Sequence, residues 1–367
     1  MKQFFCLGSY TEPILFGTGE VFHGKGQGIC ICSFEDGIIS EISKLKVRNP
    51  SFICINEKKQ RIFAVNELKE YLGEFGGGIT EVKYNANGEM SILSTRNTGG
   101  SDPCHVAMSP DGNLLCVANF ASGSLTTFGL NVNGLIDTDR HLYQHKGHGI
   151  DTNRQKGPHA HSTVYSPSGE YIYVPDLGID KVKVYKRGDK TGGEICDCPE
   201  KDVSVQPGNG PRFAEFHPNG RDFYLINEIA STVEHYAYKD GNLTFQSGIS
   251  TLPSGYPKED NICSDIHITP DGKFLYASNR GNDSIAVFSF LADGNLNLEQ
   301  IVSCGGKTPR NFAIDPTGKY LLVGNQDSDN IVTFKIKEKG RLEEISSYKF
   351  GSPVCLQFFK TTIFSGR

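Results

Sequence analysis

The chain has 367 residues, of which 37% are hydrophobic and 22% charged, so it can bury a large core as two ordinary domains or as one large β architecture. A formal net charge of −5 without a long basic run argues against a broad surface for nucleic acid or acidic membranes. The N-terminal apolar run breaks at Gly8 and no stretch reaches membrane-spanning length, so we expect a cytoplasmic protein without a membrane partner.

The earliest strand-like segment, residues 2–13 (KQFFCLGSYTEP), is an apolar run that ends in a turn. Related segments recur along the chain: a weak copy begins at Asn49, and five clear copies surround the turn prolines Pro110, Pro167, Pro218, Pro270 and Pro316. This repeat of about 50 residues, built from short alternating strands, indicates a β-propeller with one four-stranded blade per repeat.

The repeat over residues 211–250 shows the parts of one blade. "RFAEFH" and "DFYLIN" form the first two expected strands around a "PNG" turn, and "TVEHYAY" and "LTFQSGIS" form the next two around "KDGN". Proline presets φ and glycine accepts positive φ, so the recurring turn has a structural role.

Six copies leave a remnant at each end of the chain. The C-terminal "SPVCLQFFKTTIF" has the pattern of a first strand and its turn region, and the N-terminal "KQFFCLGSYTEP" that of a second strand. Joined in one blade, they close the ring without a free sheet edge. We therefore predict an all-β, seven-bladed β-propeller as a single domain over residues 1–367, with four antiparallel strands per blade and the last blade closed by the N- and C-terminal strands.

Two sets of positions should open on the same face, around the central channel: the residues that follow the second strands and those that begin the first strands. The set at the second strands comprises Tyr10, Glu67, Phe120, Leu177, Glu228, Arg280 and Gln326. The set at the first strands comprises Ser51, Cys104, His161, Arg212, Ser264, Arg310 and Val354. Both sets vary between blades, so the shared architecture does not dictate them and function can be placed there.

Ionisable members of these sets come from successive blades and should face one funnel. Arginines that meet a carboxylate and a histidine in a wet cleft can hold an anionic substrate and activate water. The candidate catalytic residues are His161, Arg212, Glu228 and Arg280. The candidate substrate-binding residues are Arg310, His105, Asp265, His267, Glu67, Gln326 and Tyr10. Structural roles stay open: an Arg212–Glu228 pair could lock two strands, and His105 and His267 could lie in the core.

The spacing of His159 and His161 would suit a metal site, because alternate residues of a strand point to one side. However, the funnel positions hold arginines rather than a set of carboxylates, and these cations would repel a divalent ion. We therefore expect no metal and no cofactor. The inserted loop 143–161 and the glycine-rich excursions 11–28 and 67–78 leave strands on the functional face and are candidate lids.

The repeats "GPRFAEFHPNGRDFYLINE", "SDIHITPDGKFLYASNR" and "TPRNFAIDPTGKYLLVGNQDSDNI", with the opening "GSYTE", resemble the lactonase-type seven-bladed propeller family over essentially the whole chain. That family includes bacterial 6-phosphogluconolactonases and the fungal carboxy-cis,cis-muconate lactonising enzyme. In the fungal enzyme a histidine, two arginines and a glutamate have been proposed to form the site. The resemblance places them at His161, Arg212, Arg280 and Glu228.

The resemblance implies a metal-independent carboxylic-ester hydrolase that opens a small anionic sugar lactone, 6-phosphogluconolactone in the pentose phosphate pathway. Glu228 or His161 would be the general base, and Arg212, Arg280 and Arg310 would hold the oxyanion or the phosphate. A muconate-type cycloisomerase and a non-catalytic scaffold for protein binding stay open as alternatives. We expect a monomer or a weak homo-oligomer.

Overall fold

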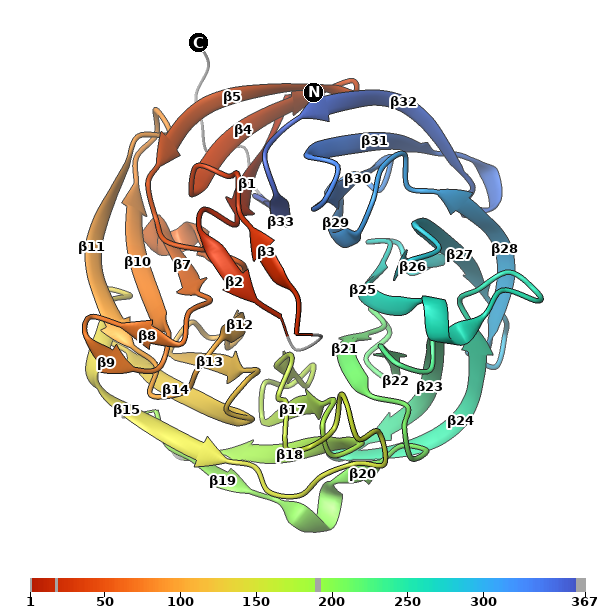
Figure 1. Cartoon of the computed structure of the whole chain (residues 1–367), viewed down its shortest axis with the longest axis horizontal. Coiled ribbons are helices and arrows are strands. Elements are labelled where there is room, and N and C mark those ends of the chain that lie inside the picture. Colours follow the sequence, from red (N-terminus) through yellow and green to blue (C-terminus); the bar gives the residue numbers. More distant parts are fainter. Residues whose placement is uncertain (1, 17–18, 189–192, 361–367) are drawn as a thin grey trace.

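The computed structural model describes residues 2–16, 19–188 and 193–360. In this part of the chain seven sheets stand as blades around a central axis (Figure 1). The predicted seven-bladed propeller is therefore confirmed. Residues 17–18 of the excursion 11–28, and residues 361–364 of the expected C-terminal turn region, lie outside the described residues.

Six blades are continuous in sequence, and their antiparallel strands follow one another from the axis outward. The inner strands are β6 (Ile53–Asn56), β12 (Pro103–Met108), β16 (Val164–Tyr165), β21 (Pro211–Phe216), β25 (Ile262–Ile268) and β29 (Pro309–Ile314). The second strands are β7 (Arg61–Asn66), β13 (Leu114–Asn119), β17 (Tyr171–Asp176), β22 (Asp222–Asn227), β26 (Phe274–Arg280) and β30 (Tyr320–Asn325).

The two outer positions of each blade complete the sheets. The third strands are β10 (Gly78–Tyr84), β14 (Ser124–Leu130), β18 (Lys181–Arg187), β23 (Thr232–Lys239), β27 (Ser284–Phe290) and β31 (Asn330–Ile336). The outermost strands are β11 (Met90–Asn97), β15 (Ile136–Gln144), β19 (Ile195–Asp197), β24 (Asn242–Ser250), β28 (Leu296–Ser303) and β32 (Leu342–Lys349). A short strand, β20 (Val203–Ser204), also pairs with β18.

The seventh blade joins the two ends of the chain, as predicted. Its inner strand is β33 (Pro353–Phe358), which pairs antiparallel with β1 (Gln3–Ser9), and β4 (Ile29–Glu35) and β5 (Ile38–Leu45) complete the sheet. In this register Phe5 lies opposite Phe358, and their ring centroids are 5.4 Å apart. The ring thus closes through backbone hydrogen bonds and a shared apolar contact.

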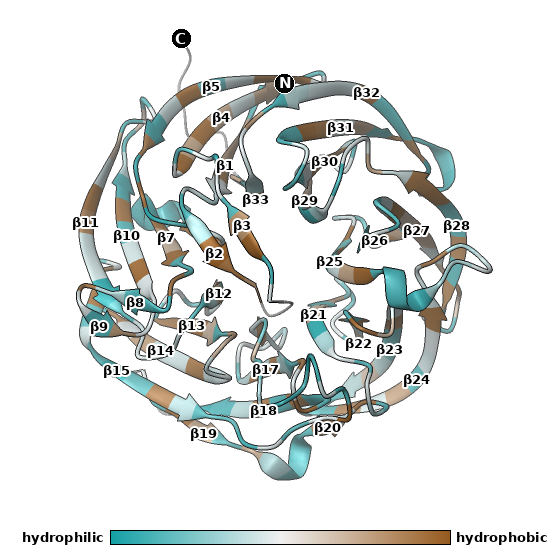
Figure 2. Ribbon diagram, in the orientation of Figure 1, coloured by the Kyte–Doolittle hydropathy of each residue, from teal (hydrophilic) through white to brown (hydrophobic). Residues whose placement is uncertain are grey.

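The core lies between adjacent blades, where sheets pack face to face. Every residue of β13 is buried, because a neighbouring blade covers each of its faces. By contrast, β24 on the rim carries half-buried and exposed residues, visible as alternating hydrophobic and hydrophilic segments in Figure 2. This burial of apolar surface between blades is the main stabilising contribution to the ring.

An asparagine at the end of most second strands has a structural role. The side-chain Nδ2 of Asn279 donates to the carbonyl of Thr251 at 2.9 Å, and Asn325 Nδ2 donates to the carbonyl of Cys304 at 3.0 Å. Each carbonyl belongs to the residue that follows the outer strand of the preceding blade. These two asparagines therefore join neighbouring blades on the functional face.

Two hairpins rise on the face where the second strands end: β2 (Pro13–Leu15) with β3 (Val21–His23), and β8 (Glu70–Tyr71) with β9 (Glu74–Phe75). The described helices are short 3₁₀ turns, η1 (Glu57–Lys59), η2 (Pro199–Lys201), η3 (Lys258–Asp260) and η4 (Glu338–Gly340). Among the described residues, no helix has the length and apolar character needed to cross a membrane.

Candidate active site

A cavity of about 340 Å³ opens at the centre of this face. Five of its lining residues come from the variable set at the ends of the second strands: Glu67, Phe120, Glu228, Arg280 and Gln326. They follow or end β7, β13, β22, β26 and β30, so five blades each supply one side chain. The internal comparison of repeats therefore predicted one wall of the cavity.

The set at the starts of the first strands lies one layer deeper. Cys104, His161 and Arg310 line the floor of the large cavity, and the same three residues also line a void of about 20 Å³ beneath it. Of these two cavities, Arg212 lines only the lower void. A polar void of this size can hold one water molecule.

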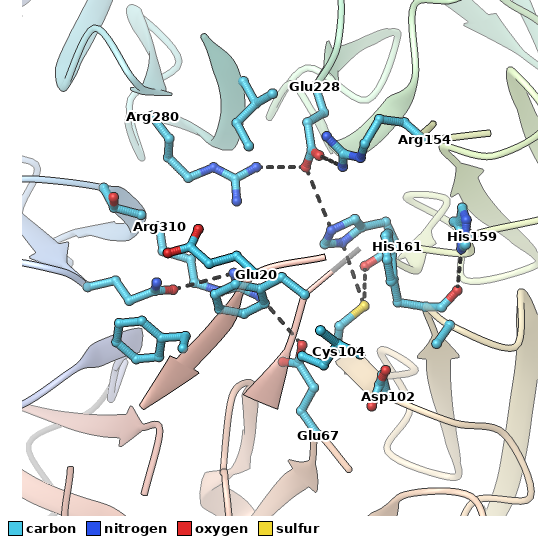
Figure 3. A pocket seen from close by; sticks show the side chains of 18 of the residues that line it. Glu20, Glu67, Asp102, Cys104, Arg154, His159, His161, Glu228, Arg280 and Arg310 are labelled. Atoms are coloured by element: carbon cyan, nitrogen blue, oxygen red, sulfur yellow. Dashed lines mark hydrogen bonds and ion pairs between the residues drawn. The ribbon is translucent and has the colours of Figure 1, made fainter. Parts of the chain in front are cut away.

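Glu228 is the centre of a charged cluster (Figure 3). Its Oε2 accepts hydrogen bonds from Arg212 Nε at 2.9 Å and from Arg280 Nη2 at 2.7 Å. Its Oε1 accepts a hydrogen bond from Arg154 Nη2. Arg212 and Arg280 are also fixed through the backbone, because each donates to a carbonyl at the start of β25. The Arg212–Glu228 ion pair does lock two strands of one blade, and it belongs to a larger network.

Charge decides the protonation state of Glu228. Burial alone favours the neutral carboxyl, but the guanidinium groups of Arg280, Arg154 and Arg212 outweigh it and hold the pKa of Glu228 well below its ordinary value. Glu228 is therefore a permanent carboxylate at neutral pH. Both of its oxygens are engaged by guanidinium groups, so Glu228 is suited to positioning cations and has no free oxygen with which to accept a proton.

His161 stands beside this cluster. Its Nε2 lies 3.9 Å from Glu228 Oε2, and its Nδ1 lies 3.6 Å from Cys104 Sγ. Burial and the nearby guanidinium of Arg212 lower the pKa of His161 well below its ordinary value, despite the opposing charge of Glu228. The imidazole is therefore neutral at neutral pH and has a lone pair available for a proton.

A second carboxylate, Glu67, occupies the opposite wall. Its Oε2 accepts a hydrogen bond from the hydroxyl of Tyr10 at 2.8 Å, and its Oε1 lies 3.6 Å from Arg310 Nη2. The guanidinium of Arg310 stacks over the ring of Tyr10 and donates to Gln326 Oε1 at 3.4 Å. Burial raises the pKa of Glu67, and Arg310 opposes this only in part. The structure thus gathers Tyr10, Glu67, Arg310 and Gln326 into one group.

Four residues predicted to bind substrate do not line the large cavity: Tyr10, which is buried and contacts Glu67, and three residues that lie elsewhere on the channel. His105 packs between Phe52 and Phe213, with ring centroids 4.2 and 4.9 Å away, and burial lowers its pKa to about 3. It is a neutral histidine of the channel wall and lines neither cavity. This agrees with the alternative that His105 has a structural role in the core.

Asp265 and His267 lie further down the channel, with Asp265 on the lower void. His267 forms ion pairs with Asp265 at 3.2 Å and with Glu215 at 3.0 Å. Although burial favours the neutral ring, these carboxylates raise the pKa of His267 well above its ordinary value. Neither residue lines the large cavity, because successive residues of an inner strand descend about 3.3 Å each along the channel.

Loop residues complete the cavity, and the comparison of repeats missed them. The β2–β3 hairpin contributes Phe16, Glu20 and Phe22, and the segment before β8 contributes Lys69, which pairs with Asp102. The inserted loop 143–161 contributes Arg154 and His159. These loops had been predicted as candidate lids, but their individual side chains have no counterpart in other blades.

The two histidines of "GPHAH" both line the cavity but make different contacts. His159 Nδ1 is hydrogen-bonded to the carbonyl of Phe120 at 2.9 Å, and its ring stacks on Phe120 with a centroid distance of 4.6 Å. In residues 2–16, 19–188 and 193–360, no group of three or more His, Cys, Asp or Glu side chains is arranged to hold a metal ion.

Comparison with known proteins identifies relatives along nearly the whole chain. The family model described as "Lactonase, 7-bladed beta-propeller" matches residues 4–358. A 6-phosphogluconolactonase of Formosa agariphila is 35% identical over 300 residues, covering 79% of this chain and 83% of the relative. A 6-phosphogluconolactonase of Bacillus subtilis is 31% identical over 319 residues, covering 85% and 88%. The solved structure of a periplasmic gluconolactonase of Pseudomonas aeruginosa superposes with a TM-score of 0.87 at 28% identity, covering 98% of this chain and 99% of that one.

Proposed function

The chain belongs to the lactonase family of seven-bladed β-propellers, and from this membership we propose that it hydrolyses a phosphorylated sugar lactone, 6-phosphogluconolactone, to the open-chain acid. This reaction breaks a cyclic ester. It requires a water molecule, a group that accepts the water's proton, and donors that stabilise the negative charge on the carbonyl oxygen.

The charge around Glu228 carries the proposal. Three guanidinium groups, those of Arg154, Arg212 and Arg280, contact a single carboxylate, which leaves a local excess of two positive charges around Glu228. Across the cavity Arg310 is balanced by Glu67. A phosphate monoester carries a charge of about −1.5 to −2 at pH 7 and would neutralise this excess.

The neutral imidazole of His161 is the general base in this mechanism. A water molecule beside Nε2 loses a proton to His161 as its oxygen attacks the lactone carbonyl carbon. The bond from that carbon to the ring oxygen then breaks, and the ring oxygen takes the proton from His161 to become a hydroxyl. Glu228, with its low pKa, orients the guanidinium groups and His161 during both steps.

Arg280 supplies the donor for the developing oxyanion. Its Nη2 is engaged by Glu228 and by the carbonyl of Cys263, whereas its Nη1 makes no hydrogen bond with the described residues. Arg280 lines the cavity, so this fixed and unengaged N–H is available to substrate. Pre-oriented donors of this kind typically contribute about 10²–10³-fold to the rate.

The test is an assay of the purified chain on 6-phosphogluconolactone and on glucono-1,5-lactone, with acid release followed by a pH indicator. We expect faster hydrolysis than in buffer alone, with a higher kcat/KM for the phosphorylated lactone. A carboxymuconate assayed in parallel tests the cycloisomerase alternative. If neither lactone is hydrolysed faster than in buffer, the proposed function is wrong. Cytoplasmic localisation and a monomeric or weakly associating state stay predictions.

A further inference from the structure

Arg154 reaches the active site on a loop that other blades lack, and this loop is fixed at both ends by Asp176. The Nδ1 of His145, directly after β15, lies 2.6 Å from Asp176 Oδ2. The backbone N–H of His159, at the far end of the loop, donates to Asp176 Oδ1 at 2.7 Å. Both members of the His145–Asp176 pair are fully buried.

Asp176 stands where most other second strands end in asparagine. In four of those five blades the asparagine donates to a backbone carbonyl, as Asn279 and Asn325 do, and in the fifth Asn227 donates to Thr232 Oγ1. Here the neighbouring group is the side chain of His145, and a carboxylate accepts hydrogen bonds from both ends of the loop. The change from asparagine to aspartate therefore matches the presence of the inserted loop.

The middle of the loop is equally constrained. Gln155 is buried and its Nε2 donates to the carbonyl of Leu177 at 2.8 Å, while its Oε1 accepts from the backbone N–H of Asp151 at 3.0 Å. The backbone N–H of Arg154 itself donates to Asp151 Oδ1 at 3.1 Å. The loop thus holds the backbone of Arg154 in one position over the cavity, which reduces the entropic cost of binding a ligand there.

The Arg154 side chain is held much less firmly than its neighbours. Its hydrogen bond to Glu228 Oε1 is the single side-chain hydrogen bond that it makes with the described residues, whereas Arg212 and Arg280 each also bind a backbone carbonyl. Its side chain is 15% exposed, compared with 6% for Arg212 and 11% for Arg280. Glu228 would keep two guanidinium partners if Arg154 turned toward a ligand.

We propose that Arg154 binds the phosphate of the substrate and determines the preference for phosphorylated over unphosphorylated lactones. This inference rests on the proposed lactonase function and assigns the specificity of that site. A guanidinium with several unengaged N–H donors binds a phosphate through two parallel hydrogen bonds, which an uncharged hydroxymethyl group cannot reproduce. Arg212 and Arg280 keep the carboxylate of Glu228 paired while Arg154 engages the substrate.

The experiment compares the wild type with Arg154→Met and Arg154→Lys on 6-phosphogluconolactone and glucono-1,5-lactone. We expect Arg154→Met to lower the ratio of the two kcat/KM values about 10- to 100-fold, because a lost hydrogen bond to a charged group has an effect of this size. Most of the loss should appear as a higher KM for the phosphorylated lactone. Arg154→Lys should recover part of the ratio. An equal loss on both lactones, or an unchanged ratio, would overturn the proposal.

Lys156→Met is the matched control, since it removes a positive charge from an exposed position of the same loop that does not line the cavity. It should leave the ratio unchanged. A general effect of loop charge would lower the ratio in this variant as well and would count against Arg154.

Product binding separates this proposal from the proposed function. By calorimetry, 6-phosphogluconate should bind the wild type and bind Arg154→Met at least about tenfold more weakly, whereas gluconate should show no such difference between the two. If the wild type hydrolyses neither lactone, the hydrolase assignment fails and this binding difference still decides the role of Arg154. If the wild type hydrolyses both lactones and the binding of 6-phosphogluconate is insensitive to Arg154, the hydrolase stands and this inference fails.

Discussion

Glu228 and Glu67 occupy the same position in two blades, directly after β22 and β7, yet they face different neighbours across one cavity (Figure 3). Glu228 accepts hydrogen bonds from three guanidinium groups, and its pKa lies well below the ordinary value. Glu67 has one guanidinium 3.6 Å away and the neutral hydroxyl of Tyr10, and its pKa is raised. One position in the repeat can therefore hold a permanent anion in one blade and a group that takes up a proton more readily in another.

The largest effect is expected from Glu228→Gln, which leaves three buried guanidinium groups without their carboxylate. We expect the free energy of unfolding to fall by about 3–5 kcal/mol, as when one partner of a buried ion pair is removed. The kcat/KM for lactone hydrolysis should fall by about 10³-fold, because Arg280 and His161 lose their common neighbour. Urea unfolding and the lactone assay measure the two quantities.

Glu259→Gln, at an exposed position, controls for the loss of one negative charge and should change neither quantity. A Glu228→Gln variant that unfolds like the wild type and keeps full activity would contradict the proposed difference between Glu228 and Glu67.

The next largest effect is expected from His161→Gln, which removes the proposed proton acceptor. His161→Gln keeps a polar side chain but cannot accept a proton, so kcat should fall by about 10²–10⁴-fold. His217→Gln is the control, because His217 is hydrogen-bonded to the carbonyl of Gly272 at the turn end of β21, outside both central cavities. Retention of wild-type kcat in His161→Gln would exclude His161 as the base.

The pH dependence of the wild type tests the state of His161 directly. Because its pKa is lowered, the imidazole stays neutral below pH 6.5, and kcat/KM should stay level from pH 7.5 through 6.5 and decline only in more acidic solution. Glucono-1,5-lactone is the substrate of choice, since a phosphate group itself titrates near about pH 6. A half-maximal rate close to pH 6.5 would show that the imidazole has an ordinary pKa.

The smallest effect is expected from Glu67→Gln. This substitution removes a carboxylate that burial already disfavours, so the free energy of unfolding at pH 7 should change by about 1 kcal/mol or less. Activity should fall less than about tenfold, because Arg310 keeps its contacts with Gln326 and Tyr10. Loss of activity as large as that of Glu228→Gln would mean that Glu67 has a part in the chemistry.

The stability difference between wild type and each variant, Glu228→Gln and Glu67→Gln, should also change with pH in opposite directions. Glu228 has a lowered folded-state pKa, so its stabilisation is present above the ordinary carboxyl pKa and is lost as the pH falls below it. The stability advantage of wild type over Glu228→Gln should therefore shrink in acid. Glu67 has a raised folded-state pKa, so the wild type should gain stability relative to Glu67→Gln as the pH falls. Unfolding curves between pH 7 and pH 4 measure both trends, and parallel trends would contradict the opposite pKa shifts.

Comparison of the repeats within the sequence predicted the seven blades, the closing blade and the two sets of channel residues. It placed Glu228, His161 and Arg280 at the cavity, because each blade sets the same backbone position at the same height on the channel wall. It predicted that His105 and His267 would line the cavity. Both lie below it, because each residue along an inner strand lies about 3.3 Å further down the channel. It could not find Arg154, because an inserted loop has no equivalent in the other blades; the loop's position on the functional face was the available signal.

The closing blade has a consequence for when the protein can first become active. Tyr10 follows β1, and its hydroxyl holds Glu67 in the neighbouring blade, so one wall of the active site depends on β1 being in place. Yet β1 reaches its inner partner only when β33, the last strand of the ring, has been synthesised. At translation rates of about 5–20 residues per second, β1 waits for its partner for about 20–70 s. During that interval the edge of β1 is unpaired, and the nascent chain has neither a closed ring nor a complete active site.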